Sequence, residues 1–170
     1  MRLIILGAGG YGRTVADIAR QSGRYATIAF LDDKSEADDV VGKCGFFAAF
    51  IDDNTEIYPG FGDNKSRLNW VKRLLKQGAA VPTIIHPSAY VSPSVELSAG
   101  TVVLPKAIVN TGVKIGCGCI INCGAIVDHG CVLEDGVHIC LGAIVKAENR
   151  VPSLMKIEAG EVVENRHWPV

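Results

Sequence analysis

The sequence has no excess of charge of either sign. Seventeen Lys and Arg residues stand against eighteen Asp and Glu residues, which leaves a formal net charge of −1 at pH 7. A chain this close to neutral creates no field that would attract nucleic acid or an anionic membrane surface. We therefore expect neither a nucleic acid nor a membrane among its partners.

Long apolar runs and export signals are also missing. No apolar segment approaches the roughly 20 residues that cross a bilayer, and Met1-Arg2 leads straight into a strand-like segment instead of a signal peptide. There are six cysteines but no CxxC pair. Without an export signal, we expect reduced thiols and a cytoplasmic protein. The apolar content of 48% is too high for a disordered chain and predicts a packed core.

The first half of the chain alternates strand-like and helix-like segments. Short apolar runs predict strands at 2–6 (RLIIL), 27–31 (TIAFL) and 57–61, and helical spacing predicts helices at 14–20 and 66–77. Residues 44–53 are ambiguous, because the apolar run GFFAAFI fits a strand or a poorly placed helix. The alternation predicts a small parallel sheet built from βαβ units, an α/β Rossmann-like half domain.

Beyond Pro82 a repeat of six residues begins. Every sixth residue from Ile85 is Ile, Leu or Val: Ile85, Val91, Leu97, Val103, Val109, Ile115, Ile121, Val127, Leu133, Ile139, Val145, Val151, Ile157 and Val163. A mostly small residue follows four positions later, often just after a glycine. This period predicts a parallel β-helix in which three six-residue units make one coil, the aliphatic residue fills the interior and the small residue fits under the corner.

The repeat is disturbed between Lys146 and Lys156, where charged residues and a proline occupy repeat positions. We interpret this segment as an irregular cap or loop, so the regular coils are expected to end near Val145. Residues 165–170 are then expected to cover the open end. The predicted domains are residues 1–82 and residues 83–170.

A glycine-rich loop follows the first predicted strand. Gly7, Gly9 and Gly12 satisfy GxGxxG at the start of a helix, and Asp32 ends the second strand twenty residues later. In such loops the backbone approaches a diphosphate, and the acid can bind ribose hydroxyls. One half domain suits a nucleotide with an attached sugar better than a dinucleotide. The alternative is a tight strand–helix turn that binds no ligand.

Two histidines lie within the repeat. His129 falls near a corner of the predicted β-helix, with Asp128 before it, Asn122 seven residues earlier and His138 nine residues later. An imidazole can accept a proton from an attacking hydroxyl or amine at neutral pH, and Asp128 could orient it. The alternative is a surface histidine of a solenoid without a role in catalysis.

The cysteines of the repeat raise the question of a zinc site, which would also have to use His129 and His138. Their phases argue against it: Cys119 and Cys131 occupy the small-residue position, and Cys117 and Cys123 face different sides. We expect no metal and interpret the buried thiols as compact core groups. A zinc enzyme of the carbonic anhydrase type would need a third histidine in phase.

Taken together, these segments resemble the bacterial sugar O- and N-acyltransferases of the sialic acid O-acetyltransferase and bacillosamine acetyltransferase type. The matching segments are LIILGAGGYGRTVADIA (3–19), FLDD (30–33), GDNKSR (62–67), IHPSAYVS (85–92) and INCGAIVDHGCV (121–132). The resemblance implies a left-handed β-helix after the Rossmann-like half, assembled as a homotrimer. It also implies transfer of an acetyl group from acetyl-CoA to an amino or hydroxyl group of a nucleotide-linked sugar in surface glycan biosynthesis.

The resemblance also implies roles for individual residues. His129 would be the general base, with Asp128 and Asn122 beside it, and His138 and Gly142 would lie near the cofactor. The nucleotide-linked sugar would be bound by Gly7, Gly9, Gly10, Tyr11, Gly12, Asp32, Asp33 and Lys34.

The chain departs from the family pattern at two of these places. Gly130 replaces the acid that usually follows the catalytic histidine, and Tyr11 stands where the glycine loop often has histidine. The alternative function is therefore a non-catalytic protein that binds a nucleotide sugar or serves assembly, with a shortened transferase site.

Overall fold

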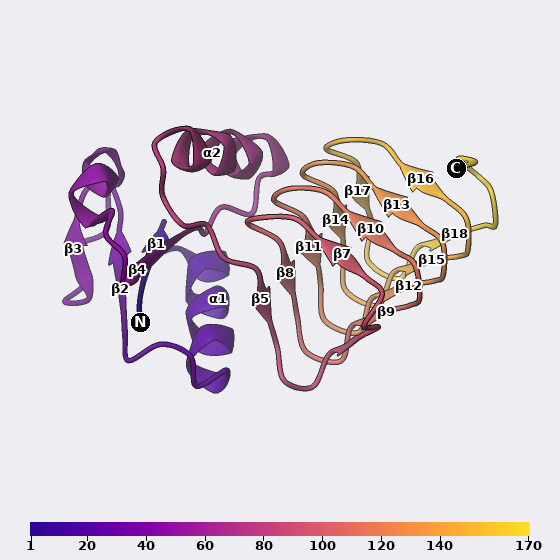
Figure 1. The fold of residues 1–170 in the computed structure, drawn as a ribbon, viewed down its shortest axis with the longest axis horizontal. Helices are drawn as coiled ribbons and strands as arrows, with labels where there is room; N and C mark the ends of the chain where they lie inside the picture. The colour runs from indigo at the N-terminus through magenta and orange to yellow at the C-terminus, as the bar shows by residue number, and fades with distance from the viewer. The chain divides into compact units, whose positions relative to one another are not determined.

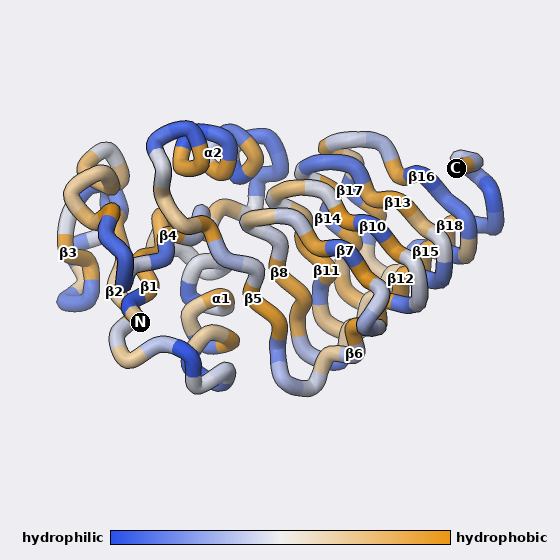
Figure 2. Tube along the Cα trace, viewed as in Figure 1, coloured by the Kyte–Doolittle hydropathy of each residue, from blue (hydrophilic) through white to orange (hydrophobic).

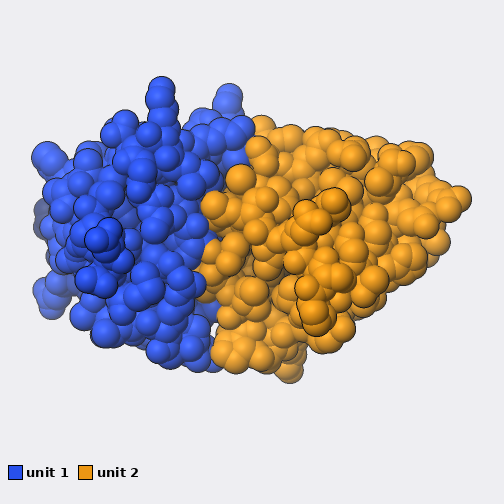
Figure 3. All heavy atoms as spheres, in the orientation of Figure 1, with its two compact units in different colours: residues 1–82 blue, residues 83–170 orange.

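The structure is a computed structural model that describes residues 1–170. The chain divides into two compact units, Met1–Pro82 and Thr83–Val170, which Figure 3 shows in separate colours. Neither of the two helices is long and apolar enough to span a bilayer.

Unit 1 is a four-stranded parallel sheet with two helices (Figure 1). Its elements are β1 (Arg2–Leu6), α1 (Gly10–Gln21), β2 (Thr27–Leu31), β3 (Val40–Gly42), the 3₁₀ helix η1 (Cys44–Phe50), β4 (Thr55–Pro59) and α2 (Asn64–Lys76). The strand order is β3-β2-β1-β4, and all pairs are parallel. The predicted α/β half domain is therefore confirmed.

Local boundaries in unit 1 differ from the sequence prediction where short-range signals were weak. Helix α1 begins at Gly10 rather than Thr14, because the glycines themselves form its first turn. The ambiguous segment is the 3₁₀ helix η1, in which Cys44 and Phe47, three residues apart, face the core. Strand β3 was not predicted. Within α2, Leu68, Val71 and Leu74 are buried, whereas Leu75 is 43% exposed.

Unit 2 winds as a left-handed parallel β-helix of fourteen two-residue strands. They are β5 (Ile84–Ile85), β6 (Tyr90–Val91), β7 (Glu96–Leu97), β8 (Val102–Val103), β9 (Ile108–Val109), β10 (Lys114–Ile115), β11 (Ile120–Ile121), β12 (Ile126–Val127), β13 (Val132–Leu133), β14 (His138–Ile139), β15 (Ile144–Val145), β16 (Arg150–Val151), β17 (Lys156–Ile157) and β18 (Val162–Val163).

The strands stack into three sheets, which form the faces of a prism. We call them the β11 face (β17-β14-β11-β8-β5), the β12 face (β18-β15-β12-β9-β6) and the β10 face (β16-β13-β10-β7). Each residue pairs with the one eighteen positions away, as Ile121 does with Ile139. One coil therefore contains three six-residue units, as predicted.

Each predicted aliphatic residue is the second residue of a strand, and most of these side chains are buried in one interior cluster. Figure 2 shows the hydrophobic segments recurring from coil to coil. The small-residue positions are buried as well, including Cys119 and Cys131 at 0% exposure. Every sixth residue from Gly100 to Arg166 has a positive φ, the conformation that turns each corner and that glycine adopts most easily.

The expected end of the repeat at Val145 is wrong. Strand β16 pairs with β13, and β17 and β18 extend the other two faces. Glu148 and Leu154 take the positive φ that glycine has elsewhere, at 58° and 63°. Asn149 occupies the buried small-residue position, where its amide donates to the carbonyls of Lys146 and Glu164. The coils therefore continue beyond Val145, although residues of unusual type occupy the glycine and small-residue positions there.

The C-terminal residues cover the end of the coils, as expected. Trp168 packs against the interior cluster, and its N–H donates to Asn149 Oδ1 at 2.9 Å. The N–H of Arg150 donates to the Trp168 carbonyl at 2.6 Å. An aromatic ring thus covers aliphatic side chains that the last coil would leave open to water.

Candidate active site

Unit 1 contains a hollow of about 360 Å³ between the loop after β1 and the loop after β4. Its lining residues are Gly7, Gly9, Gly10, Tyr11, Asp32, Gly60, Phe61, Gly62, Asp63 and Ser66. β1 and β4 are adjacent strands at the point where the strand order reverses. Open parallel sheets bind ligands at this switch point, beyond the carboxyl ends of the strands. The predicted glycine loop therefore borders a real cavity.

The glycines of this loop serve different purposes. A Cβ on Gly12 would lie 2.0 Å from the Gly7 carbonyl oxygen, so this position allows the close approach of helix and strand. A Cβ on Gly9 or Gly10 would meet nothing within 4 Å. Their backbone is therefore open to a ligand at the start of α1. That helix has no side-chain N-cap and no acid in its first turn, so the N–H groups there remain available.

Asp32 holds the glycine loop in place. Its Oδ2 accepts the Ala8 N–H at 2.7 Å, and its Oδ1 accepts those of Lys34 and Ser35 at 2.8 Å. These hydrogen bonds, the one from Ala8 first, lower the pKa of its carboxyl. Asp32 therefore stays ionised, and its two carboxylate oxygens accept three backbone N–H groups.

The next two predicted ligand contacts, Asp33 and Lys34, do not line the hollow. Asp33 Oδ1 accepts the Cys44 N–H at 3.0 Å and so fixes the start of η1.

Tyr11 lines the hollow and contacts a buried partner. Its hydroxyl lies 2.8 Å from that of Tyr58, which is fully buried. Burial raises the pKa of Tyr11 well above its usual value, and the Tyr58 hydroxyl adds to the effect. Tyr11 therefore acts as a neutral hydrogen-bonding group. Tyr58 was not predicted, because a tyrosine within a buried strand gives no separate sequence signal.

In unit 2, Asp128 and His129 lie at the corner between the β12 and β10 faces. Asp128 Oδ1 accepts the His129 N–H at 2.7 Å and the Asn110 side-chain amide at 3.1 Å, one coil away. The His129 side chain is exposed, and its ring has no hydrogen-bond partner in the chain. The corner thus presents an imidazole to solvent beside an anchored carboxylate. Asn110 was missed, since its partner is eighteen residues distant.

Asn122 and His138 meet at the other edge of the β12 face, where the β11 face begins. Asn122 Oδ1 accepts the Cys123 N–H at 2.8 Å, so its Nδ2 faces His138 Nε2 at 3.1 Å. An amide nitrogen only donates, so Nε2 accepts and the ring proton of a neutral His138 lies on Nδ1. Gly142 turns the same edge one coil further on, with φ 62°.

The predicted catalytic residues therefore form two groups in one chain. The whole β12 face separates His129, at one edge, from the Asn122–His138 pair at the other.

Glu148 lies beside the glycine that replaces the family's acid. Its Cγ is 3.6 Å from the point where a Cβ on Gly130 would be, and its N–H donates to the His129 carbonyl at 3.1 Å. Its carboxylate forms an ion pair with Arg166. Gly130, Glu148 and Arg166 border a hollow of about 550 Å³ with Pro169 and Val170. The side chain of Glu148, from the next coil, thus passes beside Gly130, while its carboxylate is paired with Arg166.

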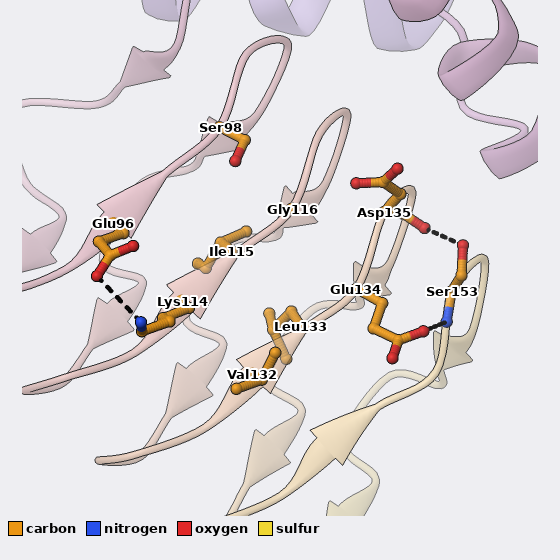
Figure 4. Close-up of a pocket in the computed structure, with 10 residues that line it drawn as sticks. All are labelled: Glu96, Ser98, Lys114, Ile115, Gly116, Val132, Leu133, Glu134, Asp135 and Ser153. Carbon is orange, nitrogen blue, oxygen red and sulfur yellow. Dashed lines mark hydrogen bonds and ion pairs between the residues drawn. The ribbon is translucent and has the colours of Figure 1, made fainter. Parts of the chain in front are cut away.

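Another hollow, of about 430 Å³, lies on the β10 face (Figure 4), and no predicted site residue lines it. Its polar groups are largely paired with one another. Lys114 forms an ion pair with Glu96, and Ser153 bonds to Glu134 and to the Asp135 carbonyl. We therefore assign no chemistry to it.

None of the six cysteines forms a disulfide, and no three His, Cys, Asp or Glu side chains are grouped so as to hold a metal ion. Burial raises the pKa of the Cys131 thiol, and the Cys44 thiol is raised to about 11 for the same reason. Both thiols therefore remain neutral, as compact core groups do.

Residues 2–74 match the PglD N-terminal domain family. A search of the curated proteins gives no match. Among solved structures, the acetyltransferase domain of PglB from Neisseria gonorrhoeae FA1090 is 33% identical, with a TM-score of 0.93 over 97% of this chain and 83% of that one. The chain belongs to the PglB/PglD-type acetyltransferases.

Two further solved structures are also similar to this chain. The same PglB domain in complex with acetyl coenzyme A superimposes with a TM-score of 0.92 at 33% identity, over 97% of this chain and 82% of that one. PerB from Caulobacter crescentus, in complex with CoA and GDP-perosamine, has a TM-score of 0.75 at 24% identity, over 97% and 89%. At that identity PerB supports the fold alone. The predicted family and fold class are confirmed.

Proposed function

We propose that this acetyltransferase moves the acetyl group of acetyl-CoA to an amino or hydroxyl group of a nucleotide-linked sugar in glycan biosynthesis. The observation that carries the proposal is the 33% identity, over 97% of the chain, to a PglB acetyltransferase domain that has been solved with acetyl coenzyme A. The hollow of unit 1 is the candidate acceptor site, and the exposed imidazole of unit 2 is the candidate base.

The glycine loop of unit 1 suits the diphosphate of the acceptor. Helix α1 presents free N–H groups at Gly10 and Tyr11, and no carboxylate lies in its first turn. A helix N-terminus of this kind favours an anion through both its donors and its dipole. The loop thus anchors the acceptor by a part that does not react, which leaves its amino or hydroxyl group free.

His129 acts as the general base. Acetyl-CoA supplies the acetyl group on an activated thioester. The acceptor nitrogen or oxygen forms a bond to the carbonyl carbon of the acetyl group, and the imidazole accepts the proton of that amino or hydroxyl group. The bond between the acetyl carbon and sulfur breaks, and the CoA thiolate leaves. Asp128, anchored by Asn110, stabilises the imidazolium that results. Glu148, beside Gly130, is already paired with Arg166, so Asp128 is the carboxylate assigned to the base.

The site requires more than one copy of the chain, and we propose a homotrimer. The first residues of the β12-face strands form an outward apolar column, Tyr90, Ile108, Ile126, Ile144 and Val162. Tyr90 is 54% and Val162 45% exposed in the single chain. Such a column marks an association surface. Covering it with another copy can bring His129 of one copy to the Asn122–His138 pair of the next.

The test is release of free CoA from acetyl-CoA in the presence of UDP- and GDP-linked amino and deoxy sugars. His129→Ala should lower the rate at least about a hundredfold, because the imidazole is the proton acceptor. Thr111→Ala is the matched control: Thr111 is exposed at the same corner, one coil earlier. Equal rates for the two variants would exclude His129 as the base.

The alternative of a non-catalytic binding or assembly protein depended on a shortened β-helix and on Gly130. The coils continue to Val163, and Glu148 lies beside Gly130. The first motive is therefore removed, and the second rests on Gly130 alone, because the Glu148 carboxylate is paired with Arg166.

A further inference from the structure

The segment Phe61–Asp63 lines the unit 1 hollow together with the glycine loop. Arg67 forms hydrogen bonds to this segment. Arg67 lies in the first turn of α2, and its exposure is 0%. Its Nη1 donates to the carbonyl oxygens of Phe61 at 3.2 Å and Gly62 at 3.1 Å, and its Nη2 donates to Asn64 Oδ1 at 2.8 Å. A single buried guanidinium thus binds two consecutive carbonyls of the loop and the first residue of α2.

These hydrogen bonds fix the direction of two peptide groups. In a trans peptide the C=O and the following N–H point in opposite directions. Because the Phe61 and Gly62 carbonyls point at Arg67, the N–H groups of Gly62 and Asp63 point away from it. Neither N–H has an acceptor in the protein, and both residues line the hollow.

The opposite side of the hollow carries donors of the same kind. The first N–H groups of α1, at Gly10 and Tyr11, have no side-chain cap. Two sets of backbone donors therefore border one cavity of about 360 Å³. A diphosphate has oxygen acceptors on two phosphorus atoms, so it can use both sets at once.

We infer that Arg67 is a positioning residue for acceptor binding: it orients the Gly62 and Asp63 N–H groups toward the diphosphate of the nucleotide-linked sugar. The inference rests on the proposed function, which places that acceptor in unit 1. Arg67 does not touch the ligand and acts through the two carbonyls. The glycine loop then supplies one half of a clamp, and the Phe61–Asp63 segment supplies the other half.

The side chain of Asp63 serves a different purpose from its N–H. Its Oδ1 caps α2 by accepting the Ser66 N–H at 2.8 Å, and this bond lowers the pKa of the carboxyl. The carboxylate is therefore ionised and opposes a nearby anion. Any contribution of Asp63 to anion binding has to come from its backbone.

Two variants at this position isolate the N–H. Asp63 has φ −67°, which proline adopts without strain, and proline lacks the N–H. Asp63→Ala and Asp63→Pro both lose the cap and the charge, and only the second loses the donor. By calorimetry with UDP and with GDP, Asp63→Pro should bind at least about tenfold more weakly than Asp63→Ala. Equal binding by the two variants would overturn the inference.

Arg67 itself is tested by a conservative pair. Arg67→Met should raise the KM of the nucleotide-linked sugar at least about tenfold and leave the KM of acetyl-CoA unchanged. Arg67→Lys, which keeps a cation and donors, should recover part of the loss. Parallel increases in both KM values would indicate a general structural defect and overturn the positioning role.

The outcomes also separate this inference from the proposed function. If wild-type protein bound neither UDP nor GDP, the nucleotide part of the proposed function would fail and this inference with it. If wild-type protein bound one of them and the Asp63 variants bound equally, only the inference would fail.

Discussion

The two units build their sites in different ways. In unit 1 the hollow is complete within one chain, because the loops after β1 and β4 come together at adjacent strands. In unit 2 the candidate catalytic groups lie at opposite edges of the β12 face, with His129 at one and the Asn122–His138 pair at the other. In an open parallel sheet the loops after adjacent strands meet at one edge, whereas in a β-helix the corners lie on different sides of the prism. We therefore expect acceptor binding to be a property of the single chain and catalysis a property of the assembly.

The largest expected effect tests that difference directly. His129→Ala and His138→Ala should each lower acetyl transfer at least about a hundredfold. If one site uses His129 of one copy and His138 of the next, a mixed trimer of the two inactive variants contains intact sites. Random mixing in equal amounts should restore up to about a quarter of the wild-type rate, because one ordered pair of copies in four is intact. The measurement is CoA release after the variants are refolded together.

Refolding each variant alone is the control, and neither alone should recover. A mixture as inactive as its components would place both histidines in the same chain's site and remove the contrast between the units.

The next effect concerns the surface that the assembly needs. Ile126→Glu places a charge in the apolar column of the β12 face and should yield monomers with at least tenfold lower activity, on the order expected when a buried charge opposes an interface. Val132→Glu is the matched control on the β10 face. Val132 is also the first residue of its strand, and its neighbours one coil away on either side are Lys114 and Arg150. It should remain a trimer, as judged by sedimentation. A monomeric Val132→Glu with trimeric Ile126→Glu would move the interface to the β10 face.

The interior of unit 2 could be predicted from the sequence because it depends on a one-dimensional rule. Side chains six residues apart occupy equivalent places, so Ile121 and Val127 reveal their role by spacing alone. The rule failed where a corner accepted an unusual residue. Asn149 is buried because two carbonyls happen to face its amide, and no local pattern announces them.

The sequence predicted the candidate-site residues only where residue type and local context are themselves a signal. His129 and the glycine loop do so by residue type and context. The roles of Asn110, Tyr58 and Arg67 depend on partners that folding brings close, such as Asp128 eighteen residues from Asn110. Asp32 was predicted as a ribose ligand, and the structure shows its hydrogen bonds to three backbone N–H groups.

A smaller effect is expected when the Asp128 carboxylate, next to His129, loses one of its hydrogen bonds. Asn110→Ala removes the amide that holds Asp128 Oδ1 and leaves His129 itself unchanged. We expect kcat to fall about tenfold, with little change in the KM of the acceptor, since we propose that the acceptor is anchored in unit 1. Steady-state kinetics with the acceptor varied separates the two parameters. A rise in acceptor KM with unchanged kcat would show that the two sites are not divided as proposed.

The smallest effect concerns the corners at which unit 2 departs from its own repeat. Leu154 has φ 63° and is 39% exposed, so it bears the strain of a left-handed conformation without deep burial in return. Leu154→Gly should raise the free energy of unfolding by up to about 1 kcal/mol, because relief of strain exceeds the added freedom of the unfolded chain. The reverse change, Gly160→Ala at φ 71° in open space, should lower it by about the same amount. Thermal unfolding measures both, and a lower melting temperature for Leu154→Gly would mean that packing of the leucine, not backbone conformation, decides the stability of these corners.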